Sequence, residues 1–214
     1  MKVKDVYQRF GIQPNLQEHM FRVCAIVVFI EEHWTGKELV DWSGTKKAAV
    51  THDLGNVVKF DLDKHPEFLG REQANINHWK RVQKQIIAKY GMDDHEATKR
   101  MLLELKVSNE ITESILNKSF DNSIMVKNSN NWPLKILYYA DFRTLPTGIG
   151  TLEERIADVR ARMPKYTSRP DFEDLVAAGR EIEGQLQRNL NIPVSEISDD
   201  SVKIDTESLL NLEV

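Results

Sequence analysis

The sequence predicts an all-α protein: one compact multi-helix domain over residues 1–194, followed by a short acidic tail at residues 195–214. Apolar residues recur at three- and four-residue spacing along most of the chain, which is the period of an amphipathic helix. Residues that start and stop helices flank these stretches. The alternation typical of strands is weak and confined to residues 57–63 and 124–126.

The first predicted helix, at residues 15–34, is apolar almost all round in its second half, which places it in the middle of the core. Gly36 ends it. A second helix is predicted at residues 41–56. A third is predicted at residues 75–90, with Gly91 just past its end.

Capping residues set the next boundaries. Asp94 can cap a fourth helix that runs to residue 106, and Ser108 opens a short fifth helix that runs to residue 120. The segment DNSIMVKNSNN, at residues 121–131, is polar and rich in turn-forming residues, so it is predicted to be a loop.

The C-terminal third carries three more helix starts. Asn131 is followed by Trp and Pro, which favours a helix through residue 144. Thr151 and Glu154 have capping-box spacing and open a helix that ends near Pro164. Pro170 opens the last long helix, which runs to about residue 189.

Composition excludes several classes. The tail holds six acidic residues and one basic residue, so its own formal charge is −5. The whole chain has a formal net charge of −4, which leaves about +1 on residues 1–194. A body so close to neutral does not favour general nucleic-acid binding. The tail itself is expected to be disordered or to dock as a short strand or helix.

The sequence also predicts no membrane association. The longest unbroken apolar run is eight residues, at 23–30, whereas a membrane-spanning helix needs about 20. The N-terminus lacks the apolar region of a secretory signal. The single cysteine, Cys24, cannot form an intramolecular disulfide, and a reducing cytoplasmic location is the simplest interpretation.

The strongest chemical feature is the dipeptide His52–Asp53. Adjacent helical residues point about 100° apart, so both can reach one ion only at the seam between helices. His19 is the best additional donor, because it interrupts the apolar face of a central helix. Asp141 interrupts the apolar run ILYYADF, and a buried carboxylate needs a cation or strong hydrogen-bond donors.

The order His19, His52–Asp53, Asp141 resembles the HD-domain superfamily of metal-dependent phosphohydrolases. The segments EHMFRVCAI, AAVTHDLGN and KILYYADFRT are similar to that family's patterns, and the resemblance covers roughly residues 15–162. It implies an HD-type helical domain in which these four residues bind a divalent ion of Mn, Fe, Co, Ni, Zn or Mg. It also implies that Asp53 is catalytic and accepts the proton of an attacking water.

The substrate implied is a small phosphorylated compound, such as a nucleotide or a related phosphoester. Arg22, Lys59 and Arg143 lie close to the ligand positions in the sequence and are candidates to bind its phosphate. Asn56 stands where many family members have lysine. That difference leaves open a non-catalytic sensor or interaction module, which would bind a metal or a ligand without turnover.

Family members with two metals use further histidines between the HD pair and the last aspartate. His78 and His95 lie in that interval, and His95 is the better candidate because its segment resembles the family's fourth helix. The histidine expected on the next helix is absent from the segment ILNKSF, so one ion is favoured over two. Taken alone, His19 and His95 also fit structural roles. The oligomeric state stays open, with a homodimer among the possibilities.

Overall fold

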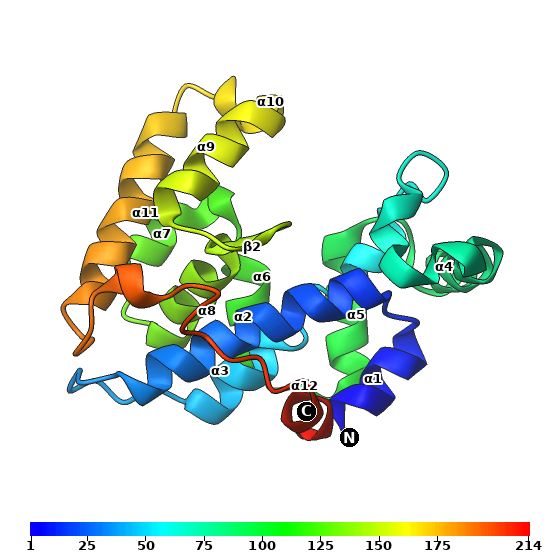
Figure 1. The fold of residues 1–214 in the computed structure, drawn as a ribbon, viewed down its shortest axis with the longest axis horizontal. Coiled ribbons are helices and arrows are strands. Elements are labelled where there is room, and N and C mark those ends of the chain that lie inside the picture. Colours follow the sequence, from blue (N-terminus) through cyan, green and yellow to red (C-terminus); the bar gives the residue numbers. More distant parts are fainter.

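The computed structural model describes residues 1–214 and confirms the all-α class, with twelve α-helices and a single two-stranded hairpin (Figure 1). The hairpin pairs β1 (Thr144–Leu145) with β2 (Gly148–Ile149) in antiparallel register. None of the helices combines the length and the apolar character needed to cross a membrane. The α-helices are α1 (Val3–Phe10), α2 (Pro14–Glu32), α3 (Trp42–Ala49), α4 (Ile76–Tyr90), α5 (Asp94–Leu105), α6 (Asn109–Asn117), α7 (Ser123–Asn128), α8 (Trp132–Phe142), α9 (Leu152–Arg162), α10 (Pro164–Thr167), α11 (Phe172–Gln187) and α12 (Thr206–Asn211).

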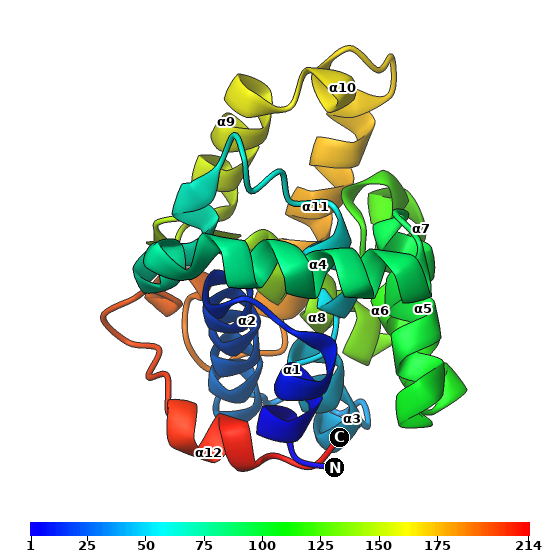
Figure 2. The same cartoon turned by 90° about the vertical axis from the view of Figure 1, so that its right-hand side faces the viewer.

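The centre of the molecule is formed by α2 and α8, which pack against each other and against α3 (Figure 2). Both helices are buried on most of their circumference, as their nearly continuous apolar sequences predict. Their side chains belong to the larger of two apolar clusters, which we call the main core. Burial of this continuous apolar surface supplies most of the driving force for folding.

A second, smaller apolar cluster lies beside the main core. We call it the second core, and it is built from α9, α11, the end of α8 and the short 3-10 turn η3 (Phe120–Asn122). Figure 1 shows α9, α10 and α11 standing together on one side of the molecule, away from α4. Phe120 and Phe142 stack with ring centroids 5.4 Å apart within this cluster.

Three sequence predictions are wrong in an informative way. The predicted loop at 121–131 contains α7, because Val126 is fully buried and α7 packs along α11. The predicted helix at 41–56 ends at Ala49, and a 3-10 turn, η1 (Leu54–Val58), follows it. The fourth helix is capped by Asp93 rather than Asp94, since the Asp93 side chain accepts the Glu96 N–H. Neither weak strand signal forms a strand: residues 124–126 lie in α7, and residues 57–63 run from the end of η1 into turns.

The acidic tail docks on the domain. Its last turn of helix, α12, lies against α1, and the backbone N–H of Val3 donates to the carbonyl of Leu212. Ile197 and Val202 are buried in the main core. Of the alternatives that the sequence left open for this segment, the structure has the short helix.

The break between α3 and η1 is held by a close approach of two backbones. The Gly55 N–H donates to the Thr98 hydroxyl at 3.0 Å, and a Cβ at residue 55 would overlap the Asp94 carbonyl oxygen. Only glycine therefore lets η1 pack directly on α5. The contact fixes the turn that carries His52 and Asp53.

Gly55→Ala is expected to destabilise the fold by about 1–3 kcal/mol, because the methyl group forces η1 away from α5. Urea unfolding followed by circular dichroism measures the change. Gly184→Ala is the matched control: this glycine lies within α11, and the nearest atom to a new Cβ is 3.7 Å away. The control should be neutral or slightly stabilising, since alanine favours helix. Equal losses in both variants would contradict the close-packing argument.

Candidate metal centre

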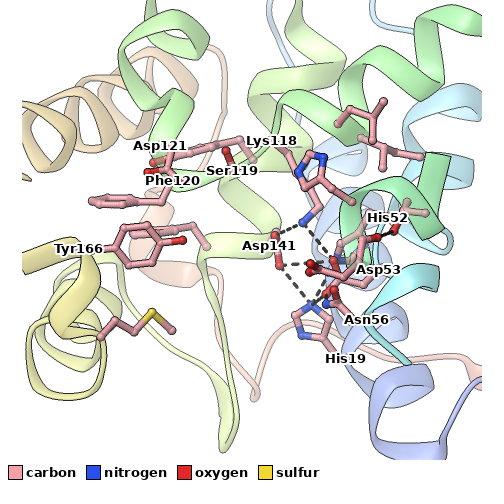
Figure 3. A pocket seen from close by; sticks show the side chains of 18 of the residues that line it. His19, His52, Asp53, Asn56, Lys118, Ser119, Phe120, Asp121, Asp141 and Tyr166 are labelled. Carbon is pink, nitrogen blue, oxygen red and sulfur yellow. Dashed lines mark hydrogen bonds and ion pairs between the residues drawn. The ribbon is translucent and has the colours of Figure 1, made fainter. Parts of the chain in front are cut away.

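A cavity of about 450 Å³ lies between the main core and the second core. One end is lined by charged and polar side chains, and the other by aromatic and apolar ones together with Asp121, Arg155 and Lys165 (Figure 3). The polar end is formed by His19, His52, Asp53, Asn56, Lys59, Asp94, His95, Lys118 and Asp141. The opposite end is formed by residues that include Phe120, Asp121, Phe142, Val159, Met163 and Tyr166.

Three of the four predicted ligands converge on one point. His19 projects from α2, His52 from the turn after α3, and Asp141 from the last turn of α8. The two imidazole Nε2 atoms lie 3.1 Å apart. Oδ1 of Asp141 is 3.1 Å from Nε2 of His19 and 3.5 Å from Nε2 of His52.

The hydrogen bond on the far side of His52 fixes its tautomer. Nδ1 of His52 lies 2.8 Å from the carbonyl oxygen of Ala49, which only accepts, so Nδ1 must be the protonated nitrogen. Nε2 then carries the lone pair and points at His19 and Asp141. This backbone contact is the kind of outer contact that orients metal-binding histidines.

The spacing of the three donor atoms fits a divalent ion. Two ligand atoms bound at about 2.1 Å lie about 3.0 Å apart at a right angle and about 3.4 Å apart at a tetrahedral angle. The observed separations of 3.1–3.5 Å match that range. The group His19, His52 and Asp141 could therefore bind a metal ion. Without an ion, the same spacing also allows His19 to donate a hydrogen bond to Asp141.

Asp53 lies at the edge of this group. Its Oδ2 is 3.6 Å from Nε2 of His19, and its Oδ1 is 3.6 Å from Nε2 of His52, so its two oxygens face different imidazoles. Oδ2 also accepts a hydrogen bond from the Asn56 amide, and Oδ1 accepts one from Lys118 at 3.2 Å. Asn56, noted in the sequence as an unusual residue, thus orients Asp53.

Lys118 is the residue of this site that the sequence did not predict. It caps the C-terminal end of α6, and its side chain is only 13% exposed. Nζ lies 2.7 Å from Oδ2 of Asp141 and 3.2 Å from Oδ1 of Asp53. Its apolar neighbours in ILNKSF are the signal that could have found it, because a lysine buried among them needs carboxylate partners.

Burial and charge act in opposite directions on the two carboxyl groups. Burial alone raises the pKa of Asp53, but the Lys118 ammonium and the two imidazoles outweigh it and lower the pKa to about 2. The same groups hold the pKa of Asp141 well below its usual range. Burial lowers the pKa of Lys118, but the two carboxylates more than reverse that and raise it. Both carboxylates and the ammonium are therefore charged at neutral pH.

The other predicted site residues divide into two groups. Lys59 and His95 line the cavity, and Nζ of Lys59 is paired with Asp94 at 2.8 Å. Arg22 and His78 do not line it: His78 is exposed on α4, and the Arg22 Nε is buried without a partner. Those two residues therefore do not contribute to the site as predicted.

The prediction that Arg143 binds phosphate is wrong. Arg143 is 1% exposed and donates to the carbonyl oxygens of Gly150, Val194 and Ile197, and to the hydroxyl of Tyr139. Two residues along a helix correspond to a rotation of about 200°, so Arg143 leaves α8 on the side opposite Asp141. It anchors the C-terminal segment instead.

The chain was compared with protein-family models, with curated proteins and with solved structures, and none of them matched. The chemistry of the site therefore rests on its own donor atoms and charges. These are two imidazoles and a carboxylate at metal-binding distance, a second carboxylate beside them, and a buried ammonium.

Proposed function

We propose that this protein is a metal-dependent phosphohydrolase of the HD type that acts on a small phosphorylated compound, such as a nucleotide or a related phosphoester. The observation that carries the proposal is the convergence of His19, His52 and Asp141 at one end of a 450 Å³ cavity. Cavities of this size bind small organic molecules. The sequence resemblance to HD-domain phosphohydrolases, which rests on the order of these same residues, points to the same class.

His19, His52 and Asp141 would hold the ion, with Asp53 beside them. When bound, a divalent ion lowers the pKa of a water ligand and polarises a phosphoryl oxygen. Asp53 stays ionised and can accept a hydrogen bond from the attacking water. A carboxylate with a pKa of about 2 is a weak base, so its main part would be to hold this water in position as a hydrogen-bond acceptor.

Basic side chains that line the cavity favour a phosphate group. Lys59 and Lys118 are among them, and the imidazole of His95 lines the same cavity. The far end supplies an apolar wall for the organic part of the substrate, with Tyr166 set against Phe120 at a ring-centroid distance of 5.4 Å (Figure 3). A phosphoester with a planar ring would place its phosphate at one end and its ring at the other.

A cytoplasmic location is part of the proposal. The single cysteine, Cys24, is buried and unpaired, which is the usual state of cysteine in a reducing compartment. A small phosphorylated metabolite would be available there.

A sensor without turnover is the second candidate. It is favoured by the two hydrogen bonds that Asp53 already accepts from Asn56 and Lys118, because these leave the carboxylate less free to act on a water. Such a protein would bind the same metal and the same phosphorylated ligand. Tight binding of a nucleotide without phosphate release would separate it from the enzyme.

The deciding experiment measures metal content and phosphate release together. Protein loaded with Mn²⁺, Co²⁺, Ni²⁺ or Mg²⁺ is incubated with a panel of nucleotides and simpler phosphoesters. We expect phosphate release with at least one ion, and its loss together with the bound metal in Asp141→Asn. Asp121→Asn, at the opposite end of the cavity, should keep its metal. No bound metal and no phosphate release under any condition would refute the proposal.

Tyr166→Ala is expected to raise KM about three- to tenfold for a nucleoside monophosphate, because an aromatic contact contributes about 0.5–1.5 kcal/mol. It should leave KM for glycerol phosphate unchanged, since that substrate has no ring to contact the far wall. Tyr166→Phe keeps the ring and should behave like the unaltered protein. Steady-state kinetics with both substrates test this expectation. An equal rise for both substrates would mean that Tyr166 supports the fold rather than the substrate.

A further inference from the structure

In each carboxylate of the candidate metal centre, both oxygens already have partners in the protein. Asp141 directs Oδ1 to the two imidazoles and Oδ2 to Nζ of Lys118. Asp53 directs Oδ2 towards His19 and Oδ1 to the same ammonium. A positive group of the protein is therefore already present on the side of both carboxylates that faces away from His19 (Figure 3).

Lys118 is held where a second cation would have to bind. Its Nζ is 2.7 Å from Oδ2 of Asp141 and 3.2 Å from Oδ1 of Asp53, and these are the oxygens that such an ion would need. The backbone next to it is fixed as well. Phe120 packs against Phe142 in the second core, and the Asn122 amide donates to the carbonyl of Asn117.

The charges of the centre favour one ion. Two carboxylates balance one divalent ion, and the ammonium adds a further positive charge. A second divalent ion would bring like charges into contact with no additional carboxylate to offset them. Asp94, the remaining acidic group at this end of the cavity, is already paired with Lys59.

We infer that Lys118 takes the place of a second metal ion. It limits the centre to one divalent ion and presents its remaining N–H to the phosphoryl group of the substrate. An ammonium has three N–H donors, and the structure uses two of them. The role towards substrate rests on the proposed function, whereas the limit of one ion rests only on the geometry of the centre.

The test counts bound metal. Each protein is dialysed to equilibrium against Mn²⁺ and analysed for manganese per chain. We expect one equivalent for the unaltered protein and one for Lys118→Met. We expect two for Lys118→His, because a new imidazole and the freed oxygens of Asp53 and Asp141 would supply ligands for a second ion. Lys59→Met is the matched control, a cavity lysine paired with a single carboxylate, and should bind one equivalent.

Activity is the second measurement. Lys118→Met should retain its ion and lose at least about tenfold in kcat for a phosphoester, a loss typical of removing a supporting group at a metal site. Lys118→Arg keeps the charge and should keep one equivalent of manganese and part of the rate. This variant also serves if Lys118→Met does not fold, as judged by circular dichroism.

Three results would overturn the inference. Two equivalents in the unaltered protein would show that Lys118 does not exclude a second ion. One equivalent in Lys118→His would show that Lys118 is not what prevents its binding. A more than tenfold weaker manganese affinity in Lys118→Met would show that Lys118 instead orients the carboxylates that bind the ion. In none of these cases does the proposed function fail, whereas an unaltered protein that binds none of Mn²⁺, Co²⁺, Ni²⁺ and Mg²⁺ and releases no phosphate would refute both.

Discussion

His52→Ala is expected to abolish metal binding and, with it, phosphate release. The His52 side chain is fully buried, and its Nε2 is one of the three donor atoms that could hold an ion. Its removal leaves two donors and an empty space where the imidazole was, so the affinity for Mn²⁺ should fall by more than about 100-fold. Without the ion, the pKa of a water in the cavity would not be lowered, and that water would not be a nucleophile near neutral pH.

Metal analysis and a phosphate assay on the same samples check this result. His65→Ala is the control, because His65 is an exposed residue that pairs with Glu67 and does not line the cavity. It should keep both the metal and the rate. A His52→Ala protein that is folded and still carries one equivalent of metal would exclude His52 as a ligand.

Arg143→Leu should cause the largest loss of stability, about 3–5 kcal/mol. The guanidinium is almost completely buried, and the substitution leaves the carbonyl oxygens of Gly150 and Ile197 without their donor. Each buried carbonyl that loses its partner costs about 1–3 kcal/mol. For a chain of this length the melting temperature should drop by about 10 °C.

Thermal and urea unfolding measure the effect. Arg162→Leu is the matched control, since Arg162 is half exposed and pairs with Asp158 at the surface, where an ion pair contributes about 0–1 kcal/mol. Well below its melting temperature, Arg143→Leu should also keep an unchanged KM for phosphoesters. A selective rise in KM without loss of stability would restore Arg143 as a phosphate-binding residue.

Much of the fold could be predicted because local signals and burial agree. The apolar period of residues 15–34 gave α2 within two residues at each end. The capping box of Thr151 and Glu154 is present as predicted. The prediction for residues 121–131 failed because their polar composition favours a loop, whereas packing against α11 buries Val126 and favours a helix. Contacts with distant elements decided its structure, and composition could not.

The site could be predicted only where the type of a residue and its apolar neighbours indicate a metal ligand. His19, His52 and Asp141 each lie in an apolar segment, and this context predicted that they form one site. Lys118 was harder to find, because its partners are 65 and 23 positions away. The apolar residues of ILNKSF indicate that it is buried, but not which carboxylates it pairs with. The prediction for Arg143 failed for a geometric reason: it is two residues from Asp141 in the sequence, but its side chain leaves the opposite side of the helix.

Asp141 stands at the boundary between the two apolar clusters. The residue before it, Ala140, belongs to the main core, and the residue after it, Phe142, belongs to the second core. An ion held by His19, His52 and Asp141 touches only the near wall of the cavity, whereas a phosphoester reaching Tyr166 touches both walls. Such a substrate would contact both apolar clusters at once. Because it would bind only the folded chain, in which the two clusters lie side by side, it would stabilise that folded state.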